Sequence, residues 1–297
     1  MSLTVNKTAI SKTLQRFANL PILVFPFIFT LSTLVLTTVH LESISWSILG
    51  IGFLTIGLSH GALDHLTQNN IGNKNKLFHF VTHYLLKSAL FGVVWLLFSD
   101  LALIVFVAYS AWHFGQADFN EWGIRKGWQS LLWGIVVLTI ILFFHRKELT
   151  WILGQIPNLY STNILKKMTD LQLLSLQLFC IVCAITLAVV YKSKQILFTF
   201  TYLLLSSFLP LLVSFGIYFI GQHSMYGWRH LLVGLNESSS RLWLKSLPFS
   251  IAGALVLLSV ALFSGANHIG IFFILLSCLS IPHAFSMHLF YAKLKLK

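Results

Sequence analysis

Charged residues are scarce in this sequence. Only 9% of its 297 residues are Asp, Glu, Lys or Arg, whereas 57% are hydrophobic. An ordinary soluble domain carries about 25% charged residues. A soluble protein of this length would need more polar surface than these residues supply, so the composition predicts an integral membrane protein.

Linkers and disulfide-forming cysteines are also lacking. No stretch rich in Pro, Ser or Gly divides the chain, so we expect a single integral membrane domain over residues 1–297. The three cysteines are Cys180, Cys183 and Cys278, and the first two form a CxxC pair inside an apolar run. Such a pair on a spanning helix is more typical of packing than of redox chemistry or zinc binding.

The apolar runs predict an all-α fold, a polytopic transmembrane helix bundle of about eight to ten spans. A helix crosses the bilayer core with about 20 apolar residues. Candidate spans lie at 19–39, 44–63, 78–98, 101–118, 129–145, 172–191, 195–209, 211–231, 247–264 and 269–290. The stretch from 195 to 231 is too long for one crossing, so we divide it at Pro210.

The basic residues indicate how these spans are oriented. The net charge is +12, and with ten spans most Lys and Arg fall on one side of the membrane. By the positive-inside rule we expect a multi-pass protein of the cell membrane with both termini in the cytoplasm. Membrane orientation therefore accounts for the net positive charge, and binding to nucleic acid is not needed to explain it. The basic loop 146–171 does not fit, and an interfacial helix there would lower the count to nine or eight. The first apolar run lacks a small-residue cleavage site and is interpreted as a retained span.

Five of the 12 histidines lie in short polar patches near one end of the predicted spans. They are His60 and His65 in patch 59–65, His113 in 111–118, His223 in 221–224 and His283 in 281–284. With ten spans, all four patches fall in the cytoplasmic half of the membrane. Because a polar residue in lipid is costly, its default interpretation is functional, and several at one depth predict one metal site.

An all-imidazole site suits iron, copper, zinc or nickel better than calcium or magnesium. A ligating histidine usually donates its second N–H to an oriented acceptor. Candidate acceptors are Asp64 beside His60 and His65, Gln116 or Asp118 beside His113, and Gln222 or Ser224 beside His223.

Three further histidines, His230, His79 and His83, are also possible metal ligands. His230 lies two helical turns after His223, so both are expected to face the same way on an α-helix. His79 and His83 have the i, i+4 spacing that can hold a metal. They lie at the start of a span, however, where placing a polar side chain costs little free energy.

Glycines and aromatic residues crowd the histidine patches. Glycine lets helices approach closely or leaves room for a bulky ligand, and both alternatives remain open for Gly61 and Gly227. The aromatic residues are typical of interfacial belts, but beside a metal they would suit a flat, unsaturated lipid. Tyr226, Trp228, Gln116 and Gln222 are candidates for a cavity lining.

In this order on a multi-span chain, the patches resemble the bacterial Brp/Blh family of membrane-bound β-carotene dioxygenases, over most of the chain from about His60 to Tyr291. The matching motifs are Ser59-His60-Gly61-Ala62-Leu63-Asp64-His65, Ala111-Trp112-His113-Phe114-Gly115, Gln222-His223-Ser224 and Pro282-His283. The resemblance implies an Fe(2+)-dependent oxidoreductase in the lipid bilayer. It would cleave β-carotene with O2 at the central double bond into two retinal molecules, which would be available to a rhodopsin.

By motif match, the resemblance implies iron ligands at His60, His113 and His223, with no catalytic residue beyond the metal ligands. The family often has another histidine four residues after the one matching His223, where this chain has Gly227. We therefore expect His230 as the fourth ligand, with His65 and His283 as substitutes.

Two other classes of membrane protein remain open. A di-iron lipid desaturase or hydroxylase also uses histidine boxes, and this chain has HxxxxH at His60/His65 and His283/His288, but no HxxHH box. The second alternative is a non-enzymatic haem-binding or transport protein that uses two histidines as axial ligands.

Overall fold

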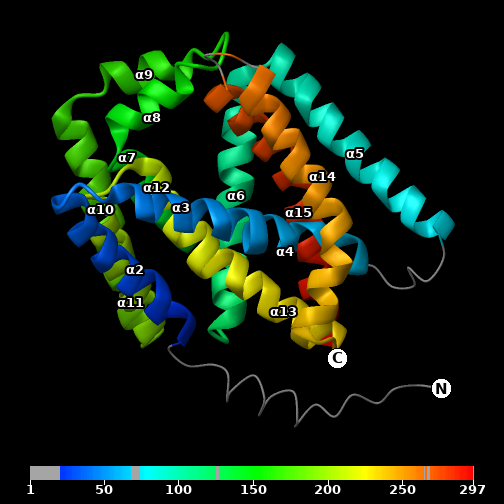
Figure 1. Cartoon of the computed structure of the whole chain (residues 1–297). Helices are drawn as coiled ribbons and strands as arrows, with labels where there is room; N and C mark the ends of the chain where they lie inside the picture. The colour runs from blue at the N-terminus through cyan, green and yellow to red at the C-terminus, as the bar shows by residue number, and fades with distance from the viewer. Residues whose placement is uncertain (1–20, 68–73, 125–126, 264, 266–267, 297) are drawn as a thin grey trace.

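The computed structural model describes residues 21–67, 74–124, 127–263, 265 and 268–296 (Figure 1). All regular elements within these ranges are helical, which confirms the predicted all-α fold. They are α2 (Pro21–Thr38), α3 (Glu42–Gly52), η1 (Phe53–Gly57), α4 (Leu58–Ala62), η2 (Asp64–Thr67), α5 (Lys74–Leu97), α6 (Ser99–Glu121), α7 (Trp128–Phe143), α8 (Arg146–Leu153), α9 (Ser161–Lys167), α10 (Asp170–Val190), α11 (Lys194–Ser206), α12 (Leu211–Tyr218), η3 (Phe219–Ser224), α13 (Met225–Leu235), α14 (Ser239–Phe263) and α15 (His268–Leu296).

Each of the ten predicted apolar segments coincides with helix, although residues 19–20 of the first segment and residue 264 of the ninth lie outside the described residues. The division at Pro210 is confirmed, since α11 ends at Ser206 and Pro210 precedes α12 with an extended ψ of 147°. Proline lacks the N–H that would continue the helix. The loop predicted at 146–171 contains the short helices α8 and α9.

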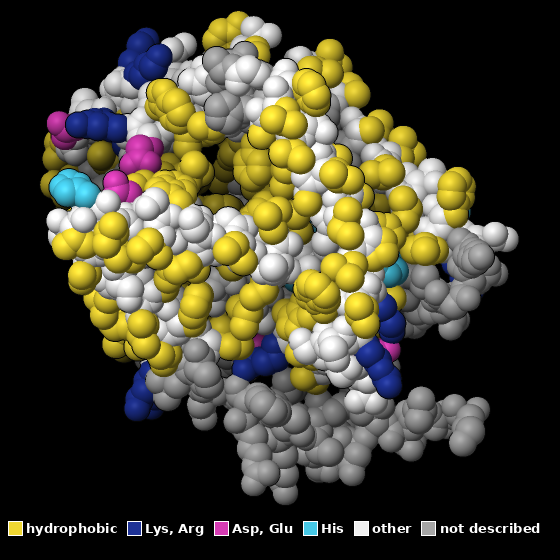
Figure 2. Space-filling model, in the orientation of Figure 1, with side chains coloured by type: hydrophobic (Ala, Val, Ile, Leu, Met, Phe, Trp, Pro, Cys, Tyr) yellow, Lys and Arg dark blue, Asp and Glu magenta, His cyan; other side chains and the backbone are white. Residues whose placement is uncertain are grey.

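Within the part of the chain that the structure describes, five helical runs are long and apolar enough to cross a membrane alone, or six if the pair α7 and α8, bent by 85°, counts as one. This number is lower than the eight to ten spans expected. The apolar helix α2 is short, the stretch around Pro210 is divided into shorter pieces, and the second half of α6 carries polar side chains. Figure 2 shows hydrophobic side chains over much of the surface, as lipid contact requires.

The helix α6 lies inside the bundle and packs against α5, α7, α13 and α15 (Figure 1). The run α3–η1–α4 lies beside the run α12–η3–α13, with η1 in contact with η3. The helix α14 then covers α4 and also contacts α15. As a result, four segments far apart in the sequence, α4, α6, η3 and α15, converge in the interior.

The closest helix packing is between α6 and α7. A Cβ added to Gly134 of α7 would lie 1.7 Å from the Ala111 carbonyl oxygen of α6. A Cβ added to Gly115 of α6 would lie 1.6 Å from the Ser130 carbonyl oxygen. Both partners are backbone atoms, so only glycine permits this approach, as is common where membrane helices pack closely.

We expect Gly134→Ala to force α6 and α7 apart and to destabilise the protein by about 1–3 kcal/mol, the usual range for overpacking. The measurement is thermal unfolding of the detergent-purified protein. Gly50→Ala is the matched control, because a Cβ there has no neighbour within 4 Å. Equal unfolding temperatures for the two variants would contradict the close packing.

Candidate metal centre

Four buried histidines, one from each converging segment, form a cluster. They are His60 of α4, His113 of α6, His223 of η3 and His283 of α15, called the histidine cluster below. Ring centroids are 4.9 Å apart for His60 and His283 and for His113 and His223. The other two neighbouring pairs are 5.2 Å apart (His113 and His283) and 5.6 Å apart (His60 and His223).

Each histidine of this cluster has at least one buried ring nitrogen without a protein partner among the described residues. No hydrogen-bonding group among the described residues meets His60 Nε2, His283 Nε2, His223 Nδ1 or either ring nitrogen of His113. Ligand atoms of His60, His223 and His283 lie within 4.8 Å of one another. Because buried polar atoms are nearly always satisfied, a group of unsatisfied imidazole nitrogens fits a metal ion with imidazole ligands.

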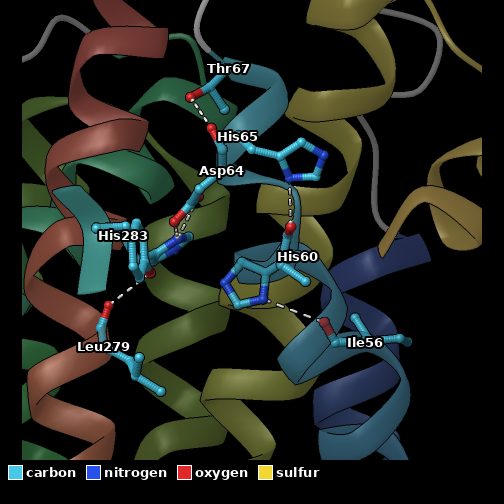
Figure 3. A network of polar contacts seen from close by, with 9 residues as sticks. Ile56, His60, Asp64, His65, Thr67, Leu279 and His283 are labelled. Atoms are coloured by element: carbon cyan, nitrogen blue, oxygen red, sulfur yellow. Dashed lines mark hydrogen bonds and ion pairs between the residues drawn. The ribbon is translucent and has the colours of Figure 1, made fainter. Parts of the chain in front are cut away.

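A carboxylate holds one of the rings. Asp64 Oδ1 and Oδ2 lie 2.9 and 3.0 Å from His283 Nδ1, which donates its N–H and leaves Nε2 as the ligand atom (Figure 3). Such carboxylate–histidine pairs are common at metal sites. The expectation that Asp64 orients His60 or His65 is therefore corrected, since the carboxylate contacts a histidine 219 residues further along the chain.

Two π-helical segments orient the rings of His60 and His223. The segment η1 ends immediately before α4, which carries His60, and His223 lies within η3. A π-helical turn accommodates an extra residue, turns the following side chains to a new direction and is frequent at functional sites. His60 Nδ1 lies 3.4 Å from the Ile56 carbonyl, which leaves Nε2 toward the cluster (Figure 3). The hydrophobic pattern of the sequence contains no signal for either segment.

Gly227 leaves room for the His60 ring. A Cβ at this position would lie 3.2 Å from His60 Cδ2, tighter than an ordinary contact. At Gly61 an added Cβ would lie 3.7 Å from His283 Nδ1, which is ordinary contact. Of the two alternatives for these glycines, Gly227 therefore supplies space, and the occupant of that space is a histidine ring.

His230 lies in a different network. Its Nε2 is 2.9 Å from Glu121 Oε2, and its Nδ1 is 3.0 Å from the Tyr291 hydroxyl. Arg229 forms an ion pair with the same carboxylate. These contacts join α13 to α6 and α15, and both ring nitrogens of His230 have protein partners.

The remaining sequence candidates also lie outside the cluster. His65 turns its Nδ1 to the Ala62 carbonyl at 3.0 Å, and its ring packs against Phe249 (Figure 3). His79 and His83 lie with ring centroids 3.9 Å apart on an exposed part of α5.

Gln116 and Asp118, the residues expected to orient His113, have other partners. Gln116 Nε2 lies 3.0 Å from His288 Nδ1. The Asp118 carboxylate accepts from Trp133 Nε1 at 2.8 Å and from the Tyr218 hydroxyl at 3.1 Å. Their expected role beside His113 is therefore corrected.

Gln222 anchors η3 instead of orienting a ring. Its Oε1 accepts from the Tyr202 hydroxyl at 2.7 Å and from the Thr199 hydroxyl at 3.1 Å, both on α11. Because His223 is the next residue, this anchor fixes the backbone from which its ring projects.

Comparison with known proteins gives the family. Residues 51–291 match the family described as beta-carotene 15,15'-dioxygenase. The chain belongs to this β-carotene dioxygenase family. The matched range contains the whole histidine cluster. Family membership confirms the resemblance inferred from the sequence and the expectation of a dioxygenase enzyme.

A curated member of the β-carotene dioxygenase family supports the same assignment. The beta-carotene 15,15'-dioxygenase of the uncultured marine bacterium 66A03 is 27% identical over 206 residues, which cover 67% of this chain and 73% of that protein. No solved structure matches the chain.

The contact between Asp64 and His283 makes a testable prediction for this dioxygenase. Asp64→Ala removes the acceptor for the His283 N–H, so we expect metal affinity to fall about 10–100-fold. Asp64→Asn keeps one oxygen acceptor and should lose less. Affinity is measured by competition with a chromophoric chelator, and Asp170→Ala, whose side chain is 93% exposed, is the control. Unchanged affinity in Asp64→Ala would show that the carboxylate does not support the metal site.

Proposed function

We propose that this chain cleaves β-carotene with O2 at the central double bond to give two retinal molecules. We further propose that the reaction depends on Fe(2+) held by His60, His113, His223 and His283. The observation that carries the proposal is the histidine cluster, with its unpartnered buried nitrogens, in a member of the β-carotene dioxygenase family.

The contacts favour His283 over His230 as the fourth ligand. His283 has its Nδ1 held by Asp64 and its Nε2 unpartnered, which is the arrangement of a ligating imidazole. His230 has partners at both nitrogens. A ligand role for His230 would require it to leave a buried carboxylate, which is costly.

The histidine cluster suits this chemistry. Neutral imidazoles suit Fe(2+) as ligands. A bound iron ion would supply the redox chemistry that O2 requires to react with a polyene. Both atoms of O2 end in the two aldehydes, so no external reductant is consumed. The protein binds the hydrocarbon, aligns its central bond with the cluster and excludes water. No general base is needed for this reaction.

Location in a membrane fits the proposed substrate, since β-carotene dissolves in apolar media. We place the chain in the cell membrane with both termini in the cytoplasm, as the distribution of basic residues indicates. Retinal released into the bilayer would be available to a rhodopsin.

The reaction is tested in bacterial cells that accumulate β-carotene. The wild-type chain should deplete β-carotene and produce retinal in a ratio of about two per carotene, detected by chromatography of extracted pigments. His60→Ala, His113→Ala and His283→Ala should abolish retinal formation, because each removes a ligand.

His79→Ala is the matched control, since this histidine is exposed and lies outside the cluster. Intact carotene in cells that contain well-expressed wild-type protein and added iron would refute the substrate assignment. A longer apocarotenal product would refute central cleavage.

The ligand set is tested by the iron content of purified protein. We expect about one iron per chain in the wild type and in His230→Gln, and much less in His283→Ala. Thermal unfolding of each variant separates loss of metal from loss of fold. The reverse pattern would exchange the roles of the two histidines, and two irons per chain would support the di-iron alternative.

A further inference from the structure

A row of four phenylalanines leads away from the histidine cluster. Phe219 lies beside two of the ligand rings, with centroids 5.9 Å from His60 and 5.7 Å from His223. Phe53 of η1 lies 6.1 Å from Phe219. Phe272 of α15 continues the row 6.0 Å beyond Phe53.

The fourth member, Phe215 of α12, stacks on Phe219 with centroids 5.2 Å apart and planes inclined by 14°. These side chains, Phe53, Phe215, Phe219 and Phe272, are called the phenylalanine row below. They come from α12 and the adjoining η3, from η1 and from α15, so the row connects three parts of the chain that meet only in the folded protein.

The phenylalanine row is not part of the closed core. All four of its side chains are partly exposed, whereas the core aromatics Trp133, Tyr202 and Tyr218 are completely buried. Aromatic rings that reach a buried polar cluster and also remain partly open are typical of a ligand site.

The surface of the molecule has a hollow near α12 and α3. Figure 2 shows it with hydrophobic side chains on its wall, and in Figure 1 the same place lies above α3, between α12 and α6. The helix α12 carries Phe215, and α3 continues directly into η1, which carries Phe53. The hollow therefore opens beside elements that lead to Phe215 and Phe53, on a surface rich in exposed hydrophobic side chains.

We propose that the phenylalanine row is the wall against which a long polyene hydrocarbon lies, from the hollow inward to the histidine cluster. This inference rests on the proposed function, because that function supplies the occupant. A conjugated hydrocarbon has no polar group to fix its position. It is held by dispersion and by flat contact with aromatic faces, both of which the row supplies.

Phe219 is the positioning residue of this row. It contacts two histidine rings directly and stacks on Phe215, so its ring sets the distance between the polyene and the cluster. Phe53 and Phe272 lie further along the row from the His60 and His223 rings and contribute contact area. We therefore expect Phe219 substitutions to change the position of cleavage, and Phe53 and Phe272 substitutions to change affinity.

The test measures binding apart from turnover. β-carotene is achiral, so it shows visible circular dichroism only when an asymmetric site holds it. Purified protein in detergent is titrated with β-carotene under argon, where no cleavage occurs. The wild type should give an induced band, and Phe53→Ala and Phe272→Ala should each weaken binding about two- to tenfold.

Phe179→Ala is the matched control, because this phenylalanine is 59% exposed on α10, outside the row. Phe53→Leu and Phe272→Leu keep apolar volume but remove the flat face, so they carry the test if the alanine variants unfold early. In air, Phe272→Leu should raise KM with little change in kcat, and Phe219→Leu should yield apocarotenals of unequal length.

The outcomes separate this inference from the proposed function. An induced band that weakens in the row variants, without retinal formation in air, would support the row and refute the proposed function. Retinal formation with unchanged affinity, KM and product length in all row variants would refute the row and leave the proposed function standing.

Discussion

The structure depends on unsatisfied imidazole nitrogens inside an apolar helix bundle. A buried polar atom without a partner costs about 1–3 kcal/mol, and the histidine cluster contains several. Such a group persists only if its surroundings hold the rings in place. Here Asp64 fixes the ring of His283, Gly227 leaves space for the ring of His60, and the segment η3 directs His223 inward.

Two buried carboxylates, Asp118 and Glu121, help to hold the helices around this cluster. Asp118 links α6 to α7 and α12 through Trp133 and Tyr218. Glu121 links α6 to α13 through His230. These charge-assisted hydrogen bonds are strong in a low dielectric, and they hold the helices that carry the cluster. His230, whose ring nitrogens have protein partners, thus belongs to a supporting network, whereas the histidine cluster retains unpartnered ring nitrogens.

An apolar environment serves both the fold and the proposed chemistry. The exposed hydrophobic surface suits lipid, and lipid is also the medium in which a carotenoid is available. The hollow and the phenylalanine row provide an apolar route between that medium and the cluster. A substrate without polar groups must be positioned by shape alone, which explains why rings from three separate parts of the chain are used.

Much of the architecture follows from local pattern. The ten apolar segments, the break at Pro210 and the patches around His60, His113 and His223 were all predictable, because apolar run length, proline and intramembrane histidine act through nearby residues. The positions of the apolar helical segments were predictable, but the number of helices that cross the whole membrane was not. That number depends on bends such as the 85° turn between α7 and α8.

The choice of histidines shows the limit of such reasoning. The regular α-helical period places His230 on the same face as His223. His223, however, lies in the π-helical segment η3, which changes the direction of its side chain relative to that of His230. The expected partner of Asp64 was likewise a histidine within a few residues. Thus the sequence by itself determined the membrane class, the helical segments and the presence of a histidine-rich site. Only the tertiary structure decided that His283 joins the cluster and His230 does not, because side-chain direction depends on helix packing between segments far apart in the chain.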